Sequence, residues 1–254
     1  MPNWLEGRHA LITGGGSGIG ASAATHLNAG GAKVTVVGRR AEPLEFIRNI
    51  VDGTAVQCDV TDRGQIERAY GEARAANGPI EMLIVNAGIG DSAPFGRTTR
   101  EAWDKIIAVN LTAAFDCVQL ALDDLLASEN GRIVFVASVA GLRGVPYAAH
   151  YAASKHGLIG LMRSLAAEFA KTNLTVNAVC PGFVDTQMTM DSAARIADAT
   201  GRSFEDAHGA LAGMNASGRL VHPDTIGTMI LTLCLPQSQD VNGAAIPIDG
   251  GTTA

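Results

Sequence analysis

Short runs of apolar residues recur along the chain, and each is separated from the next by a longer segment of mixed polarity. Short apolar runs bounded by glycine, proline or polar residues are typical of buried strands, and longer mixed segments are typical of helices. The apolar runs predict strands at about 10–12, 33–37, 54–58, 82–85, 133–136, 174–179 and 245–248. The segments between them predict helices at about 19–29, 62–77, 100–128, 149–171 and 223–235.

This alternation of strands and helices predicts a parallel sheet with helices on both faces, because each parallel connection must cross over the sheet. We therefore expect a single α/β domain over residues 1–254, with about seven strands between two helical layers. The alternation fails at about 186–219, where methionine, glycine and alanine dominate. Methionine adapts to varied ligands, so this segment predicts a lid of short helices over a cofactor and a substrate; an ordinary surface insertion is the alternative.

Composition and charge narrow the class of protein. Of the 254 residues, 47% are hydrophobic and 17% are charged, which is enough for a sizeable core. The net charge of −6 argues against nucleic acid as a partner, because phosphate binding needs a basic face. No apolar run reaches the roughly 18 residues of a membrane helix, and the N-terminus lacks the pattern of a signal peptide. We expect a cytoplasmic protein that binds neither nucleic acid nor membrane.

The cysteines and histidines show no metal-binding pattern. The four cysteines are scattered without CxxC spacing, as expected of small core residues in a reducing compartment: Cys58, Cys117, Cys180 and Cys234. His150 and His156 form no HExxH motif, and a surface or pocket-lining role is expected of both. We predict neither a disulfide nor a metal site.

A glycine-rich turn joins the first predicted strand to the first predicted helix. It reads Thr13-Gly14-Gly15-Gly16-Ser17-Gly18-Ile19-Gly20. In this geometry backbone N–H groups and a helix N-terminus hold a phosphate, and glycine lets the backbone approach a pyrophosphate without a Cβ in the way. No GK[ST] follows, so the turn predicts a dinucleotide site rather than a Walker P-loop.

The residues after the second predicted strand bear on which dinucleotide binds. An acid at this point would bind the ribose 2′-hydroxyl of NAD, but the strand ends in Gly38, followed by Arg39 and Arg40. An arginine fork suits a 2′-phosphate, so NADP(H) is favoured over NAD(H). The alternative is that both arginines are solvated, and the nearby Glu42 weakens the argument.

Three other predicted strands end where the ligand crevice of an open α/β sheet lies. The third ends at Asp59-Val60, where a carboxylate either meets an adenine amino group or begins the next helix, whose predicted cap is Thr61. The fourth strand ends in Asn86-Ala87-Gly88, and the sixth ends near Pro181-Gly182.

Three side chains with complementary acid–base chemistry follow the fifth predicted strand. Ser138 lies just past its end, and Tyr151 and Lys155 come four apart, on one face of a predicted helix. An ammonium beside a phenol lowers the phenol's pKa from roughly 10, and a serine hydroxyl can hold the same reacting oxygen. The trio predicts proton transfer at a carbonyl or alcohol oxygen, unless Tyr151 and Lys155 are an ordinary pair on the helix surface.

Other single residues suggest roles beside this trio. Asn110 interrupts an apolar stretch, and a buried amide needs hydrogen-bond partners, so it either bonds the backbone and holds a water or is purely structural. Tyr147, Phe183 and Met188 are candidates for the wall of a substrate pocket, with simple packing as the alternative.

Together these motifs resemble the short-chain dehydrogenase/reductase family, in its single-domain branch, over essentially the whole chain. The residues that carry the resemblance are Thr13, Gly14, Gly18 and Gly20 for the TGxxxGxG motif, Asn86-Ala87-Gly88 and Pro181-Gly182 for the NAG and PG turns, and Asn110, Ser138, Tyr151 and Lys155 for the catalytic tetrad. The resemblance implies a Rossmann-type, doubly wound sheet.

The resemblance also implies a mechanism, in which a hydride moves between a nicotinamide cofactor and a carbonyl carbon. Tyr151 would be the acid in reduction and the base in oxidation. Lys155 would lower the pKa of Tyr151 and bind the nicotinamide ribose, and Ser138 would position the substrate oxygen. Asn110 would hold a water that relays protons through Lys155.

The implied cofactor contacts come from the strand ends and the start of the lid. Thr186 would bond the carboxamide and Asp59 the adenine. The full set is Gly14, Ser17, Gly18, Ile19, Gly20, Arg39, Arg40, Asp59, Val60, Asn86, Ala87, Gly88, Tyr151, Lys155, Pro181, Gly182, Val184 and Thr186. Two departures from the family conflict: Gly38 replaces the acid of NAD-type members, and Ser17 replaces the basic residue of NADP-type members.

The resemblance predicts an NAD(P)-dependent oxidoreductase that interconverts a secondary alcohol and a ketone. The resemblance implies substrate contacts at Ser138 and Tyr151, and the pocket-wall candidates Tyr147, Phe183 and Met188 are added to them. Arginines that could meet the phosphates of a CoA thioester are Arg143, Arg195 and Arg202, with solvated arginines as the alternative. A 3-hydroxyacyl or 3-oxoacyl thioester is the favoured substrate, and a free cyclic or aromatic alcohol is the alternative. A nicotinamide-sensing module without chemistry would be a different class, but it predicts a lost Tyr or Lys. Family members commonly pair their two long helices, so we expect a homotetramer.

Overall fold

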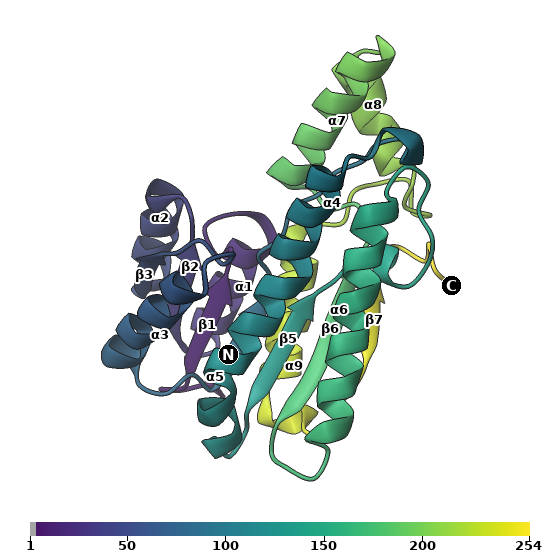
Figure 1. Cartoon of the computed structure of the whole chain (residues 1–254). Coiled ribbons are helices and arrows are strands. Elements are labelled where there is room, and N and C mark those ends of the chain that lie inside the picture. The colour runs from purple at the N-terminus through teal and green to yellow at the C-terminus, as the bar shows by residue number, and fades with distance from the viewer. Residues whose placement is uncertain (1–3) are drawn as a thin grey trace.

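The computed structural model describes residues 4–254 and contains one seven-stranded sheet. The strands run parallel in the order β3-β2-β1-β4-β5-β6-β7 (Figure 1). Their bounds are β1 His9–Thr13, β2 Lys33–Gly38, β3 Thr54–Gln57, β4 Met82–Val85, β5 Arg132–Val136, β6 Thr175–Pro181 and β7 Ala245–Ile248. The strand order reverses between β1 and β4, and a crevice for ligands forms outside the carboxyl ends of the strands at such a point.

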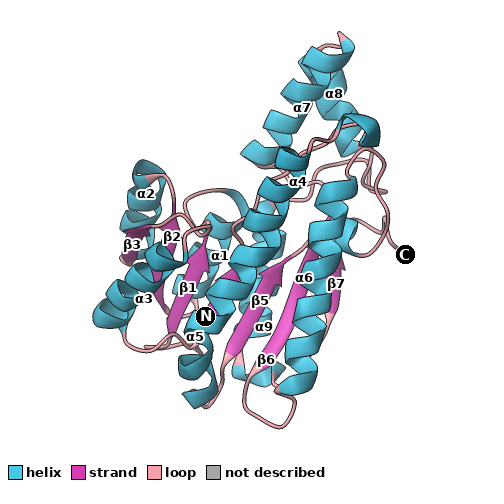
Figure 2. Cartoon of the chain, in the orientation of Figure 1, coloured by secondary structure: helices cyan, strands magenta, loops and turns pink. Residues whose placement is uncertain are grey.

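The helices cover both faces of the sheet, as the alternating pattern predicts (Figure 2). They are α1 Gly18–Ala29, α2 Ala41–Val51, α3 Arg63–Asn77, α4 Arg100–Ile107, α5 Ala113–Ala127, α6 Ala149–Glu168, α7 Gln187–Thr200, α8 Phe204–Ala212 and α9 Pro223–Cys234. Helices α3, α5 and α6 share one buried apolar cluster with the sheet, and α1, α2 and α9 share another. The predicted doubly wound, three-layer fold is therefore confirmed.

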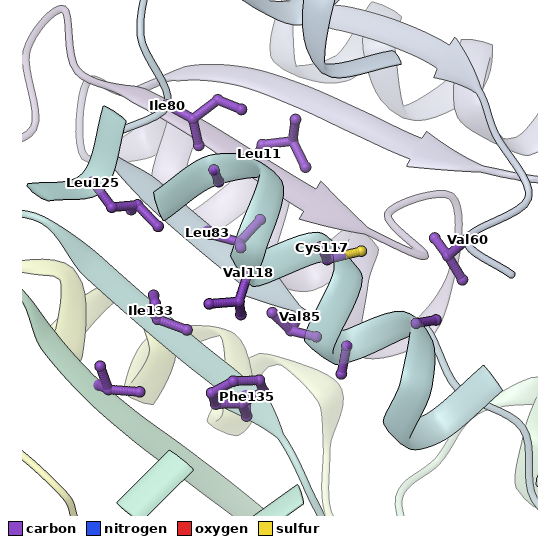
Figure 3. Close-up of a cluster of buried hydrophobic side chains, with 14 of the residues drawn as sticks. Leu11, Val60, Ile80, Leu83, Val85, Cys117, Val118, Leu125, Ile133 and Phe135 are labelled. Atoms are coloured by element: carbon purple, nitrogen blue, oxygen red, sulfur yellow. The ribbon is translucent and has the colours of Figure 1, made fainter. Parts of the chain in front are cut away.

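Successive side chains of the central strands point to opposite faces of the sheet and so enter the two apolar layers in turn. In β4, Leu83 joins the layer under α5, whereas Met82 and Ile84 join the layer under α1 and α9. Figure 3 shows Val118 of α5 lying over Leu83 and its neighbours on the first of these faces. A strand buried on both faces reads as a continuous apolar run, which is why these strands were predictable.

The structure corrects the predicted helices in three places. The apolar pattern predicts no helix at α2, and it predicts one uniform helix where the structure has α4, a π-helical turn at Ala108–Thr112 and then α5. The N-cap of α3 is Asp62, whose side chain accepts a hydrogen bond from the Gln65 amide, and not Thr61. The Thr61 hydroxyl instead donates to Asp59, so the cap lies one residue later than predicted.

Helices α7 and α8 stand apart from the sheet, beyond the carboxyl ends of the strands (Figure 1). They occupy the segment predicted as a lid, and they pack on each other through Ala193, Ala207 and Leu211. Phe183, which follows β6, packs against this small cluster and joins it to the body of the protein.

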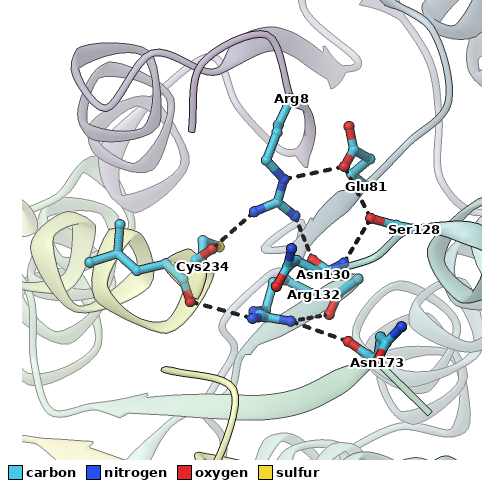
Figure 4. Close-up of polar contacts among 9 residues, drawn as sticks. Arg8, Glu81, Ser128, Asn130, Arg132, Asn173 and Cys234 are labelled. Carbon is cyan, nitrogen blue, oxygen red and sulfur yellow. Dashed lines mark hydrogen bonds and ion pairs between the residues drawn. The ribbon is translucent and has the colours of Figure 1, made fainter. Parts of the chain in front are cut away.

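A polar network closes the amino end of the sheet, opposite the crevice. Arg132 of β5 is fully buried and donates only to backbone carbonyls, whereas Arg8 also pairs with Glu81 at 3.2 Å (Figure 4). Burial, with the nearby Arg8 cation, lowers the pKa of Arg132. These arginines tie β1, β5 and the end of α9 together, far from the strand ends that carry the candidate chemistry.

The continuous helical stretch Arg100–Ala127 is long and apolar enough to cross a membrane by length and composition alone. The apolar runs of the sequence predict no such stretch, because polar residues interrupt them. Only 39% of its most apolar window is buried within the chain, yet α5 packs on the sheet as a core helix does. The large apolar side chains that this stretch exposes are Trp103 and Phe115.

Candidate active site

A cavity of about 1120 Å³ opens at the carboxyl ends of the strands. Its walls are the glycine-rich turn, the ends of β2 to β6, the start of α6 and one side of α7. This volume exceeds the roughly 300–1,000 Å³ of a pocket for one small ligand. The cavity is large enough for a dinucleotide and a substrate together.

Asn86 locks the glycine-rich turn to the end of β4. Its amide nitrogen donates to the carbonyls of Thr13 at 2.8 Å and Gly14 at 3.1 Å, while the Thr13 hydroxyl accepts from the amides of Asn86 and Ala87. Gly14 has a φ of +66°, and a Cβ there would lie 2.9 Å from the Asn86 amide nitrogen. Glycine is therefore required at this position by both conformation and space.

The start of α1 has the free donors that a pyrophosphate needs. Ser17 is the N-cap, yet its side chain makes no capping hydrogen bond, so the first amides of α1 keep their hydrogen-bonding capacity. Gly18 has a φ of +54°, and a Cβ there would lie 3.1 Å from Thr186 at the start of α7. These glycines form a cradle that side chains would fill, and it fits a dinucleotide phosphate. Gly20 does not line the cavity; it packs against the Gly14 carbonyl.

The far end of the cavity carries the residues predicted to choose the dinucleotide. Arg39 and Arg40 line it, and neither forms an ion pair with Glu42 or with any other carboxylate in residues 4–254. Asp59 accepts hydrogen bonds from the Thr61 amide at 3.0 Å and hydroxyl at 2.8 Å. The Thr61 amide, more than any other group, lowers the pKa of Asp59, so this end presents a fixed carboxylate beside two available guanidinium groups.

Asn110 lies in the π-helical turn and holds a loop by a pair of hydrogen bonds. Its side-chain oxygen accepts from the Ile89 amide at 2.9 Å, and its nitrogen donates to the Ile89 carbonyl at 3.0 Å and to Ser154 at 3.2 Å. The structure shows the bonding to the backbone that the first expectation includes, and a purely structural amide would make the same bonds. Asn110 is buried and does not line the cavity, so it acts on the site through the loop after Gly88. π-helical turns are frequent at functional sites.

Ser138, Tyr151 and Lys155 converge on the same cavity from two elements. Ser138 follows β5, and its hydroxyl accepts a hydrogen bond from the Ala140 amide at 3.1 Å. The Lys155 ammonium donates to the Val136 carbonyl at 3.0 Å and lies 5.7 Å from the centre of the Tyr151 ring. Because all three line the cavity, the sequence pair Tyr151/Lys155 is not an ordinary pair on the helix surface.

Burial sets the protonation of this trio. It raises the pKa of Tyr151, against the lowering effect of the Ser138 hydroxyl, and it lowers the pKa of Lys155 to about 8. The expectation that the ammonium lowers the pKa of the phenol is therefore not met in this structure, where the ammonium faces a backbone carbonyl. A neutral phenol is the form that can donate a proton to a carbonyl oxygen.

We expect Lys155→Met to stabilise the protein at neutral pH and not at high pH. At pH 7 the ammonium is charged in both states, and its burial costs free energy in the folded state. Between about pH 8 and 10.5 the unfolded chain still binds the proton that the folded chain has released, so this cost disappears as pH rises. The pKa shift of Lys155 corresponds to about 3 kcal/mol of lost stability at pH 7. Removing the lysine also removes its hydrogen bond to Val136, which lowers the expected gain in stability by about 1 kcal/mol.

Urea denaturation of the two proteins at pH 7 and pH 10 checks this expectation. The variant should be more stable by about 2 kcal/mol at pH 7, with the gap closed at pH 10. Lys171→Met, which replaces an exposed lysine just after α6, is the matched control and should show no such pH-dependent gap. A difference between wild type and Lys155→Met that is equal at both pH values would contradict the expectation.

The substrate side of the cavity carries the predicted wall residues and several that were not predicted. Tyr147 is exposed with a φ of +62°, and its carbonyl accepts from the Ala93 amide at 2.8 Å. The Met188 thioether of α7 faces Gly90, where a Cβ would lie 3.3 Å from the sulfur. Of the three arginines considered for a thioester's phosphates, only Arg195 lines the cavity.

Some functional contacts have little or no signal in the sequence. Ser154 links Asn110 to the Tyr151 carbonyl, and only its place one residue before Lys155 hints at that role. Asn215 holds Phe183 through its amide and carbonyl, and nothing in the local sequence indicates it. His150 is fully buried, contrary to the surface or lining role expected of it.

Comparison with known proteins adds independent findings. Residues 8–197 match the family model described as short chain dehydrogenase. The chain is 37% identical to the 3-oxoacyl-[acyl-carrier-protein] reductase MabA of Mycobacterium tuberculosis, over 96% of this chain and 92% of the relative. Its structure resembles a single-substitution variant of actinorhodin polyketide ketoreductase with NADPH, with a TM-score of 0.93, 32% identity and 99% of each chain covered. It also resembles levodione reductase, with a TM-score of 0.91, 32% identity and 97% and 98% of the two chains covered.

Proposed function

The chain belongs to the short-chain dehydrogenase/reductase family and is an NAD(P)-dependent oxidoreductase of secondary alcohols and ketones, and we propose that it reduces 3-oxoacyl thioesters with NADPH. The observation that carries the enzymatic proposal is the convergence of Ser138, Tyr151 and Lys155 on the cavity that also contains the glycine-rich cradle. A sensing module would have no use for an intact proton donor beside a buried ammonium.

In the proposed mechanism the bound nicotinamide supplies a hydride to the carbonyl carbon. Ser138 holds the substrate oxygen through its hydroxyl, and Tyr151 donates its phenolic proton to that oxygen as it becomes an alcohol. The Lys155 ammonium, which donates to the Val136 carbonyl in this structure, would turn toward Tyr151 to stabilise the phenolate that forms, and it also suits the hydroxyls of the nicotinamide ribose. Thr186, the N-cap of α7, would bond the carboxamide, and Asp59 would meet the adenine.

The availability of Arg39 and Arg40 supports NADPH as the preferred cofactor. Both guanidinium groups line the adenosine end of the cavity without a carboxylate partner among the described residues, and Gly38 leaves the end of β2 without an acid. A 2′-phosphate would supply the anionic partner that these two guanidinium groups lack. The ketoreductase that the structure resembles has NADPH bound.

Three cations on the substrate side support a thioester. Arg97, Lys105 and Arg195 line this half of the cavity, and none of them pairs with a carboxylate among residues 4–254. Such a cluster in a chain of net charge −6 favours a substrate with an anionic group remote from the ketone, such as the phosphates of a pantetheine thioester. The resemblance to levodione reductase favours a neutral cyclic ketone as the second candidate.

Turnover of matched substrates tests the thioester proposal. With NADPH, we expect the 3-oxoacyl-CoA to be reduced with a kcat/KM at least tenfold above that of the same acyl group on N-acetylcysteamine, which lacks phosphate. Replacing the three cations together with Gln should lower kcat/KM for the CoA thioester about 30-fold, at roughly 0.7 kcal/mol per exposed charge pair, and leave the phosphate-free thioester unchanged.

Arg202→Gln is the matched control, because Arg202 lies on the same lid without lining the cavity. Equal losses on both thioesters would show that the cations support the fold and not the substrate. Faster turnover of a cyclic ketone than of either thioester would favour the second candidate.

We also propose that residues 1–254 form a single domain, with 186–219 as a lid, and that four copies associate. The α4–α5 stretch exposes Trp103 and Phe115 and is only partly buried within one chain, which suits pairing of these helices with those of a second copy. Light scattering at micromolar concentration should give four times the chain mass, and Phe115→Asp should reduce it. A monomer mass for the wild type would contradict this proposal.

A cytoplasmic location is proposed on the state of the cysteines. All four are free and buried, and burial raises their pKa values, so they are inert thiols of the kind found in reducing compartments.

A further inference from the structure

His150 is a buried imidazole next to the proton donor. It is the second residue of α6, directly before Tyr151, and its side chain has no exposed surface. Neither ring nitrogen has a hydrogen-bond partner among residues 4–254. Burying a polar group without a partner costs free energy, so a histidine at this position calls for a physical reason.

One carboxylate lies almost within hydrogen-bond distance of this ring. Nε2 of His150 is 3.5 Å from Oδ2 of Asp91, whose other oxygen accepts a 2.8 Å hydrogen bond from the Ser92 amide. Normal hydrogen bonds of this type span about 2.7–3.2 Å, so a shift of a few tenths of an ångström would make one. That bond would be charge-assisted, and such bonds are roughly twice as strong as neutral ones.

Asp91 belongs to the substrate loop, residues 89–94, which forms one wall of the cavity. The first residue of this loop is held by Asn110, the Ala93 amide donates to the Tyr147 carbonyl at 2.8 Å, and the Gly90 carbonyl lies 3.5 Å from Arg195 of α7. The loop therefore contacts the π-helical turn, the segment just before α6 and the lid. The Asp91 side chain is 42% exposed, so packing leaves it room to move toward the ring.

We propose that His150 is a positioning residue, whose contact with Asp91 holds the substrate loop opposite the Tyr151 hydroxyl and shortens when substrate enters. This inference rests on the proposed function, because it concerns the substrate half of the same site. Neighbouring residues of a helix point about 100° apart, so Tyr151 faces the cavity while His150 faces the loop. Asp91 lies on the substrate side of the cavity, so its loss should affect substrate binding and spare cofactor binding.

Asp91→Asn is the first test, because this exposed side chain keeps its size and its contact with Ser92 while its charge is removed. We expect KM for the ketone substrate to rise about tenfold, kcat to change less than twofold, and the Kd of NADPH by fluorescence titration to stay the same. If Asp91 had a purely structural role, Asp91→Asn would lower the thermal stability of the protein and weaken the binding of both substrate and NADPH. An unchanged KM would overturn the proposal.

The double variant His150→Gln/Asp91→Asn shows whether the two residues act together. Its KM should be no higher than that of the more affected single variant, since one contact can be lost only once. If the KM of the double variant rises by the product of the two single increases, the two residues act independently and the proposal is overturned. His156→Gln, a replacement of an exposed histidine on the same helix, is the matched control and should leave KM unchanged.

A measurement that does not need turnover separates this inference from the proposed function. Hydrogen exchange of the Ala93 amide should become about fivefold faster in Asp91→Asn than in wild type, because the loop opens locally more often. An unchanged exchange rate would overturn the proposal. Wild-type protein that reduces no ketone would refute the proposed function, while the exchange rates would still decide whether His150 and Asp91 hold the loop.

Discussion

Tyr151→Phe should lower kcat for ketone reduction about 10³-fold, because general acid catalysis of this kind contributes roughly 10²–10⁴ in rate. The substitution removes one oxygen from a ring that is half-buried at the start of α6 and leaves the packing of that ring in place. The phenol is kept neutral by burial, which raises its pKa, and is therefore the form that donates a proton. Of the other two tyrosines, Tyr70 is buried outside the cavity and Tyr147 is exposed, so we expect neither to replace it.

The Kd of NADPH, measured by fluorescence titration, should be unchanged in the same variant, because the glycine-rich cradle and the arginines are untouched. Tyr70→Phe is the matched control: it removes a phenol oxygen that is buried outside the cavity, and it should keep near wild-type turnover. Turnover retained in Tyr151→Phe would assign the proton to another group. A wild type that binds NADPH without reducing any ketone would favour the sensing module.

The parts of this site that are local in sequence could be predicted from it. The glycine-rich turn, the NAG turn and the Tyr151/Lys155 pair each lie within a few residues of a recognisable strand or helix. Because parallel strands place their carboxyl ends at one edge, an alternating pattern is sufficient to bring these motifs together. Nearly all of these predicted motifs line one cavity because the parallel strands end at the same edge of the sheet.

The parts that depend on distant contacts could not be predicted. Gly20 has the pattern of a cofactor contact, yet it serves the packing of α1 on the Gly14 carbonyl. The π-helical turn at Asn110 depends on a pairing with Ile89, 21 residues earlier, and a helical pattern carries no trace of it. Burial raises the pKa of Tyr151 and the Ser138 hydroxyl lowers it, whereas the charge four residues away in the sequence faces the Val136 carbonyl.

Gly38→Asp should reverse the preference for NADPH over NADH by at least about 100-fold in the ratio of kcat/KM values, which corresponds to about 2.8 kcal/mol. A Cβ at Gly38 would meet Leu44 at 3.6 Å and Gly14 at 3.9 Å, which are ordinary contacts, and the residue has no positive φ. A carboxylate can therefore stand at the end of β2, where it would accept hydrogen bonds from a ribose diol and repel a 2′-phosphate.

Two further variants test why the preference changes. The first separates the charge of the new carboxylate from its size, and the second separates repulsion of the 2′-phosphate from loss of its arginine partners. Gly38→Asn adds the same bulk without charge and should leave the preference largely intact. Arg39→Ala/Arg40→Ala should weaken NADPH alone, because it removes the partners of the phosphate without adding a partner for the diol. If Gly38→Asp lowers kcat/KM equally with NADPH and NADH, the end of β2 does not contact the ribose. If the Kd of NADPH is unchanged in the double arginine variant, residues other than Arg39 and Arg40 bind the 2′-phosphate.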